Sequence, residues 1–247
     1  MKNTKAEDSV RNILLILCEA FTLYTLITLL INKDYENLPI CIVTFALVFI
    51  PIMVEKWFSC RIAFAVYLFA MVYTISPMLG DCYKLYYSTI WWDKLLHTFG
   101  GVIFALFGLY LFEHMGGNKS KYVACAIFAL CFSMALSVAW EFFEFGSDQL
   151  FGTDMQHDSI ITSFNSYALG NEIGTMGSVE NVTEVIVNGQ PLPINGYLDI
   201  GLIDSMTDML LETLGAVFVA AGYVLDKGKH PAFVAKAEYE KARLQAV

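Results

Sequence analysis

The sequence predicts an all-α fold, a polytopic bundle of six transmembrane helices with a long loop outside the cytoplasm. Composition favours this class, since 57% of the residues are hydrophobic, only 16% are charged, and the mean hydropathy is +0.56. A soluble domain has about a quarter of its residues charged, and polar positions interrupt its apolar runs every few residues. Here the apolar runs are long and nearly free of charge.

Six runs approach or reach the length needed to cross a bilayer, which is about 20 apolar residues. We expect them at residues 12–31, 38–54, 62–78, 95–112, 122–143 and 205–225 of a single membrane domain, 1–247. The first run is longer than the apolar core of a signal peptide, and no small-residue cleavage site follows it, so we expect a retained helix. All connections are short except the polar segment 146–204.

The basic residues predict the orientation of the helices. No Lys or Arg occurs from Phe145 through Asp226, so the positive-inside rule places the 146–204 loop outside the cytoplasm. Six spans then put both termini in the cytoplasm, together with all of the 15 Lys and Arg residues except Lys33, Lys84 and Lys94. We therefore expect a multi-pass protein of the bacterial inner membrane.

Two segments outside the spans have patterns of their own. In the loop, TEVIVNGQPLPI alternates apolar residues around Asn188 and Gly189, which suit the positive φ angles of a tight turn, so we expect a small β-hairpin. After the last span, PAFVAKAEYEKARLQAV predicts a short cytoplasmic helix with Lys236 and Glu240 one turn apart. The net charge of −9 argues against nucleic acid as a partner and leaves the lipid bilayer as the expected one.

Small residues within the spans suggest how the helices pack. Gly100, Gly101 and Gly108 in the fourth run, with Gly215 and Gly222 in the last, allow close approach of helices, so we expect runs four to six to form the core of the bundle. The six cysteines have no metal-type spacing. Only Cys41 and Cys82 are expected near the oxidising side, and a bridge between them stays open.

Ionisable residues form stripes at the span ends that this topology places outside. The stripes are Asp93 with His97, then Glu141, Glu144 and Asp148, then Asp204, Asp208 and Glu212. Spacings of three or four put the members of each stripe on one helical face. With about 1.5 Å of rise per residue, His97, Glu141 and Asp208 should lie about one turn inside the outer boundary.

Several like charges cannot remain bare at that depth, so some must protonate, pair with a cation or bind metal. Carboxylate oxygens together with an imidazole suit Mg²⁺, Mn²⁺ or Zn²⁺. The predicted ligands of such a divalent metal are His97, Glu141, Glu144, Asp148, Asp204 and Asp208. As a catalytic base we expect Glu141 or Asp208.

The same residues have a plainer interpretation. Acids at the interface often only meet water and headgroups, and Trp91, Trp92 and Trp140 mark the aromatic belt where this occurs. The deeper Glu212, like Glu19 in the first span, is equally compatible with a protonated packing residue. A third histidine, in DMQHDS, could reach the site only if its loop folds back.

Three sequence blocks together resemble a known family. WWDKLLHTFGG, SVAWEFFEFGSDQLFG and GYLDIGLIDSMTDMLLETLGA, in this order and separated by the long loop, are similar to the YjdF-type family of bacterial integral membrane proteins. The resemblance extends over residues 91–222, whereas the first three spans match only in hydropathy. A more distant similarity links the chain to VanZ-type membrane proteins, which also carry acidic and histidine residues at span ends. These resemblances imply a membrane fold with a polar site, and they imply no reaction.

The leading hypothesis is an outward-facing acidic and histidine site, in which a metal assists hydrolysis or group transfer on a lipid or lipid-linked headgroup. One alternative is a cation or proton-coupled transporter, and another is a structural or regulatory protein without catalysis. Transport predicts a second polar stripe toward the cytoplasm, but the inner halves of spans four to six show little beyond Glu113, His114 and Asp226 at the boundary. No GxSxG, P-loop or HExxH motif occurs, so these soluble-enzyme signatures do not apply.

Overall fold

The computed structural model describes residues 4–89, 91–117, 121–228 and 233–235, and these divide into two compact units. The first unit consists of residues 1–138 and 209–247, and the second of residues 139–208. Two long helices, α7 (Tyr122–Phe151) and α8 (Leu202–Asp226), contribute to both units.

Six helical stretches of the described chain are long and apolar enough to cross a membrane. They are Ala6–Asn32, Leu38–Trp57, Phe64–Cys82, Trp92–His114, Tyr122–Phe151 and Leu202–Asp226. Large apolar side chains cover their outer faces, such as Ile16 at 64% and Phe218 at 77% exposure, which suits a hydrocarbon solvent. A helix bonds its own backbone polar groups, as a membrane requires, and the predicted all-α fold with six such helices is confirmed.

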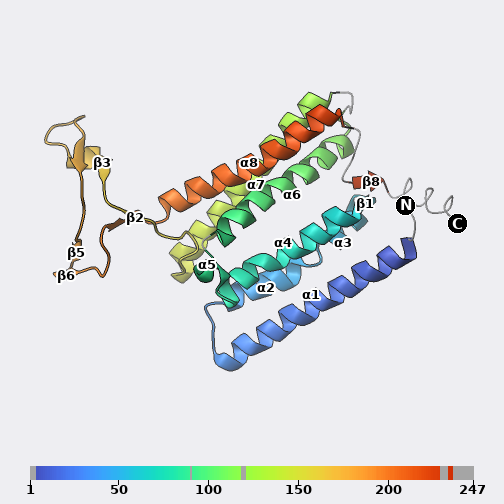
Figure 1. The fold of residues 1–247 in the computed structure, drawn as a ribbon, viewed down its shortest axis with the longest axis horizontal. Coiled ribbons are helices and arrows are strands. Elements are labelled where there is room, and N and C mark those ends of the chain that lie inside the picture. Colours follow the sequence, from blue (N-terminus) through green and yellow to red (C-terminus); the bar gives the residue numbers. More distant parts are fainter. Residues whose placement is uncertain (1–3, 90, 118–120, 229–232, 236–247) are drawn as a thin grey trace. The chain divides into compact units, whose positions relative to one another are not determined.

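The helices that lie wholly in the first unit pack side by side (Figure 1). They are α1 (Thr4–Asn32), α2 (Leu38–Leu47), α3 (Ile50–Trp57), α4 (Phe64–Cys82), the short α5 (Leu85–Ser88) and α6 (Trp92–His114). Helix α1 packs against α2 and α4, and α4 packs against α6. Buried residues of α1, α4 and the α2–α3 region form one apolar cluster that includes Cys18, Tyr67 and Met71.

The second apolar run folds as two helices, α2 and α3, with a break at Val48 and Phe49. Pro51 explains the break, because a proline within a helix lacks the N–H that would bond the carbonyl of Leu47, and its ring crowds that carbonyl. One apolar run in the sequence therefore gives two helices, which together make one stretch long enough to cross a membrane, Leu38–Trp57.

Helix α6 and the parts of α7 and α8 in the first unit share a core that includes Ala105, Ala129 and Ala216. A Cβ at Gly101 would collide with the carbonyl of Glu212, and one at Gly215 would collide with the carbonyl of Thr98. These glycines thus allow α6 and α8 to touch, as the sequence predicts. Gly222 was expected to do the same, but among the described residues no atom of another helix lies within 4 Å of its Cβ position.

A two-stranded sheet joins distant parts of the first unit. Strand β1 (Cys60–Ile62) pairs antiparallel with β8 (Phe233–Ala235). The helix predicted for the C-terminal segment is wrong at these three residues, and the rest of that segment, 236–247, lies outside the described residues. Cys41 and Cys82 are free thiols.

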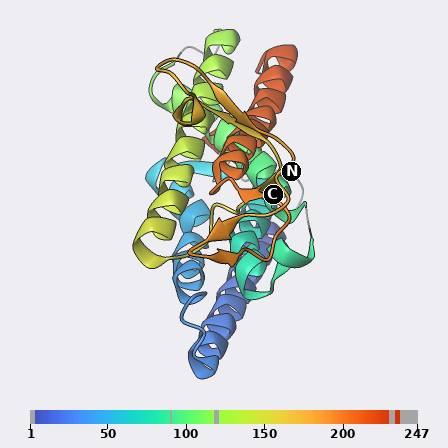
Figure 2. The same cartoon turned by 90° about the vertical axis from the view of Figure 1, so that its left-hand side faces the viewer.

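The second unit carries three short antiparallel strand pairs, drawn in gold to orange in Figure 2. These are β2 (Ile160–Ile161) with β7 (Tyr197–Leu198), β3 (Phe164–Ser166) with β4 (Gly177–Val179), and β5 (Ile186–Val187) with β6 (Gln190–Pro191); a 3₁₀ turn, η1, covers Tyr167–Leu169. The β5–β6 hairpin turns at Asn188 and Gly189, whose φ angles are 53° and 80°. The predicted hairpin is therefore present, with a turn that requires two left-handed residues.

Candidate functional site

In the first unit, His97 of α6 lies between two carboxylates. Its Nε2 is 3.4 Å from Oδ1 of Asp93, and its Nδ1 is 3.8 Å from Oε2 of Glu212 on α8. Asp93 also pairs with Lys94, whose Nζ is 3.0 Å from Oδ2. Both ring nitrogens of a buried histidine thus have a negative group within ion-pair distance.

Local helix geometry explains this arrangement. Asp93 and His97 are four residues apart on α6, so their side chains share one face. Asp93 also lies in the first turn, where the helix dipole favours a negative charge. The contacts at Gly101 and Gly215 bring α8 against that part of α6, and Glu212 comes with it.

Glu212 is almost completely buried, at 3% exposure. Among the described residues, no hydrogen-bond donor reaches its Oε1. A Cβ on Gly100 would lie 2.7 Å from the hydroxyl of Tyr73 and 3.7 Å from the carboxyl carbon of Glu212. Gly100 therefore leaves the space in which the Glu212 carboxyl meets α6 and α4.

In the second unit, Glu141 and Glu144 lie on α7, and Asp208 lies on α8. All three side chains are buried, with exposures of 6%, 7% and 1%. The indole Nε1 of Trp140 donates to Oε1 of Glu144 at 2.7 Å. Three predicted ligands are therefore out of solvent, as the depth along the helices suggested for Glu141 and Asp208 but not for Glu144.

Asp148 holds the start of the loop. Its Oδ1 accepts hydrogen bonds from the hydroxyl of Thr153 and the N–H of Met155, both at 2.7 Å. Its Oδ2 accepts from the N–H of Gln156 at 2.9 Å. These bonds fold the chain back after α7, and the ligand role expected for Asp148 stays a prediction.

Two further aspartates tie the loop to the start of α8. Asp199 accepts from the N–H groups of Ser159 and Ile203, each at 2.7 Å, and so caps the helix. Asp204 accepts from the N–H of His157 at 3.1 Å, and its Oδ2 lies 4.0 Å from Nδ1 of the same histidine. The loop does fold back, and it brings His157 to a predicted ligand.

Acidic and imidazole groups of the described chain could hold a metal ion. One such group includes Asp93 and His97, and another includes His157 and Asp204. The sequence places Asp93 on the same stripe as His97, and their i, i+4 spacing was a signal for the pair, but Asp93 was not among the predicted ligands. Glu212 was also placed on a stripe, and its contact with His97 was not predicted.

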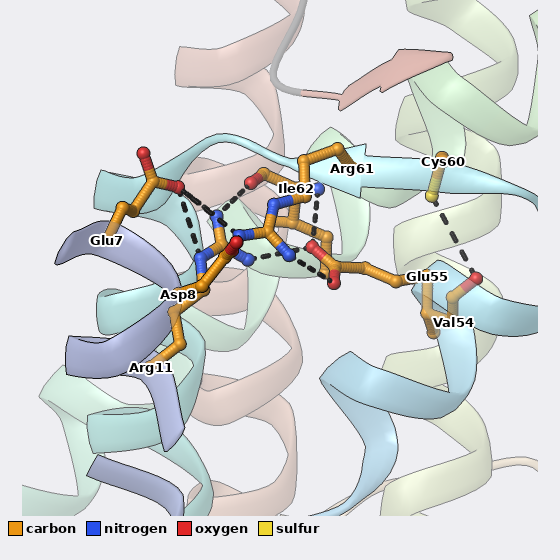
Figure 3. Close-up of polar contacts among 8 residues, drawn as sticks. All are labelled: Glu7, Asp8, Arg11, Val54, Glu55, Cys60, Arg61 and Ile62. Carbon is orange, nitrogen blue, oxygen red and sulfur yellow. Dashed lines mark hydrogen bonds and ion pairs between the residues drawn. The ribbon is translucent and has the colours of Figure 1, made fainter. Parts of the chain in front are cut away.

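A second polar cluster, in the first unit, surrounds the buried Arg11 of α1 (Figure 3). Its guanidinium donates to Oε1 of Glu55 at 2.7 Å and to Oε1 of Glu7 at 2.9 Å. A further bond reaches the carbonyl of Ile62 at 2.6 Å, and the ring of Tyr67 lies 4.4 Å from the guanidinium. From the sequence, Arg11 was only one of the basic residues that predict the orientation of the helices, and this cluster was not predicted.

Glu55 is the centre of the cluster. Besides Arg11, it accepts from the N–H of Ile62 at 2.9 Å and from Nη1 of Arg61 at 3.3 Å. Arg61 also pairs with Asp8. Through hydrogen bonds and ion pairs among two arginines, three acids and the backbone of Ile62, this cluster joins α1, α3 and β1 (Figure 3).

Comparison with known proteins gives a family but no activity. No curated protein and no solved structure matches the chain. Residues 13–227 match a protein family described as "Predicted membrane protein (DUF2238)". Together with the six apolar helices, this match indicates a multi-pass protein in a lipid bilayer. Because the match covers most of its length, the chain belongs to the DUF2238 family of predicted membrane proteins.

Proposed function

We propose that the chain is a bacterial inner-membrane protein that binds a divalent metal at its outer face and acts on a lipid or lipid-linked headgroup by hydrolysis or group transfer. The observation that carries the proposal is the buried His97 with a carboxylate beside each ring nitrogen. A cation between Nε2 of His97 and Asp93 would relieve the negative charge that these side chains gather. The family match and the resemblance to YjdF-type and VanZ-type proteins are compatible with this function and supply no reaction.

Asp208 is proposed as a further ligand because it precedes Glu212 by one turn on α8. Helices α6 and α8 run in the same direction in the first unit, with Gly215 near Thr98 and Tyr223 bonded to Glu113. Glu141 and Glu144 are proposed to complete the site from α7, and Asp148 and Asp204 to combine loop contacts with ligation.

A bound Mg²⁺, Mn²⁺ or Zn²⁺ would polarise a phosphoryl or carbonyl oxygen and lower the pKa of a water molecule. The chain's own part is then to hold the headgroup at the bilayer surface and to accept a proton from the attacking group. Glu141 or Asp208 is the proposed base, since both are buried carboxylates on the predicted site face.

The test is metal analysis of the purified protein with titration of Mn²⁺ and Zn²⁺ by calorimetry. His97→Ala and Asp208→Asn are expected to lose most of the bound metal, whereas His114→Ala, which changes a histidine at the other end of α6, should retain it. Equal metal in all four proteins, or none in any, would contradict the proposal. Absence of metal would favour the structural alternative.

The transport alternative has one observation in its favour. Glu19 lies near the middle of the Ala6–Asn32 span, and neither carboxylate oxygen has a hydrogen-bond partner among the described residues. A carboxyl in such a place is expected to be neutral, and in a proton transporter such a group exchanges the transported proton. A transporter would need that exchange, so Glu19→Gln should abolish proton flux in proteoliposomes; equal flux in wild type and variant would dismiss the alternative.

A further inference from the structure

Glu212 has a feature that a packing residue does not need. It is a carboxylate almost three turns inside α8 with 3% exposure, and its Oε1 finds no donor in the part of the chain that is described. Burying an incompletely bonded carboxyl costs free energy. A side chain that lowers stability at a buried position is a candidate for a functional role.

We infer that Glu212 is the positioning residue of His97, an inference that rests on the proposed metal site. Its Oε2 lies 3.8 Å from Nδ1, which is too long for a hydrogen bond and makes the contact electrostatic. A negative group on that side favours a hydrogen on Nδ1. The lone pair then belongs to Nε2, the nitrogen that faces Asp93.

The two carboxylates favour different positions of the hydrogen on the imidazole ring of His97. Glu212 favours a hydrogen at Nδ1, whereas a bare lone pair on Nε2 would face the negative Oδ1 of Asp93 at 3.4 Å. A cation held by His97 and Asp93 would allow the hydrogen to stay on Nδ1 and would remove the repulsion between the Nε2 lone pair and Asp93. A carboxylate behind a histidine, with metal in front, is a recurrent arrangement in which the carboxylate fixes ring orientation.

The surrounding groups hold Glu212 in this position. Its own backbone carbonyl lies against Gly101, which fixes that turn of α8 on α6. The missing side chain of Gly100 leaves room for the carboxyl beside the hydroxyl of Tyr73. His97 itself is buried, so neither partner can turn into solvent. Glu212 is therefore held beside His97 by the packing of α8 against α6 and α4.

The test compares Glu212→Gln with wild type in Co²⁺ and Zn²⁺ titrations, together with thermal unfolding in the same detergent. The variant keeps the side-chain volume and loses the charge, so metal affinity should fall about 10-fold to 100-fold. The visible Co²⁺ spectrum of any residual complex should change, because the ring is no longer oriented. The melting temperature should stay the same or rise, because a buried charge has been removed.

Glu113→Gln is the matched control, because Glu113 is an acid near the other end of α6 whose Oε1 accepts from Tyr223 at 3.2 Å. It should leave metal affinity unchanged. If Glu212→Gln binds metal like wild type while His97→Ala does not, the positioning role is wrong and the metal site stands. If it loses affinity only in step with a lowered melting temperature, Glu212 is merely structural. If wild type binds neither ion, the proposed function fails and this inference with it.

Discussion

Arg11 shows how one residue can organise the first unit. A buried guanidinium has lost its water, and it is tolerated here because carboxylates from two helices, a carbonyl and an aromatic ring surround it. Arginine suits this position better than lysine, since its planar fork reaches several acceptors at once. The chain thereby fixes the beginning of α1 to the end of α3.

Arg11→Met should destabilise the protein by about 3 kcal/mol, because Glu7 and Glu55 would lose the more buried of the two arginines that pair with them and keep only Arg61. Arg11→Lys should lose less, since it keeps the charge but not the fork. Thermal unfolding in detergent measures both. A change below about 0.5 kcal/mol for Arg11→Met would show that the cluster contributes little.

Asp154, in the loop of the second unit, gives a prediction of pH dependence. Partial loss of water around its exposed carboxyl raises the pKa, the negative charge of Asp158 adds to the rise, and His157 opposes it. A raised folded-state pKa means that the stability from the protonated group is present at low pH and is lost as pH rises through that pKa. At pH 7 the ionised Asp154 therefore weakens the loop.

Asp154→Asn should increase hydrogen-exchange protection of the loop peptides at pH 7, and the difference from wild type should disappear as the pH falls below the unfolded-state pKa of about 3.9. The gain should be small, because Asp154 is exposed and water screens its charge. Exchange is compared between the two proteins at each pH, so that intrinsic rates cancel. Weaker protection of the variant at pH 7 would reverse the assigned sign.

At this scale the sequence predicts which residues are ionisable and share a helix face, and little about their partners. The stripe Asp204, Asp208, Glu212 follows from spacing alone. The contact of Glu212 with His97 depends on how two helices pack, and the pairing of Arg11 with Glu55 joins residues 44 apart. Asp148 was expected to bind metal, but spacing cannot show that its oxygens bond the following loop.

At the scale of elements, glycines decide how closely the helices approach. Gly215→Ala should cost about 1–3 kcal/mol, because the new Cβ would meet the backbone carbonyl of Thr98, which cannot move aside as a side chain can. Gly222→Ala, on the same helix, should be neutral or stabilising by up to about 1 kcal/mol, since its Cβ position is open and alanine favours helix. Equal unfolding temperatures for the two variants would contradict this account of packing.

The six helices were predictable because each apolar run is long, and the β5–β6 turn was predictable because few residues adopt its φ angles. The break before Pro51 was not predicted, because a hydropathy pattern does not depend on whether a residue has a backbone N–H. The sequence predicted helix for the residues of strand β8. These residues form their strand by pairing with β1, which is far away in the sequence and therefore has no effect on local propensity.

At the scale of the molecule, the first unit has a different polar cluster toward each end of α6. His97 with its carboxylates lies near the start of that helix. Near the other end, the hydroxyl of Tyr110 donates to the carbonyl of Phe58, which follows α3 and the Arg11 cluster. The positive-inside rule assigns the arginine end to the cytoplasm and the histidine end to the outside.

This assignment can be tested by single cysteines and a membrane-impermeant maleimide on intact cells. Glu172→Cys, exposed in the loop of the second unit, should be labelled before the cells are broken. Lys56→Cys, exposed at the end of α3, should be labelled only after the cells are broken. The positive-inside rule predicts this, because Lys56 lies on the same predicted side as all of the 15 Lys and Arg residues except Lys33, Lys84 and Lys94. The unaltered chain is the background control, since most native thiols lie in helices that can span the membrane. The reverse pattern would place the His97 site in the cytoplasm, where a headgroup of the inner leaflet would replace the proposed outer one.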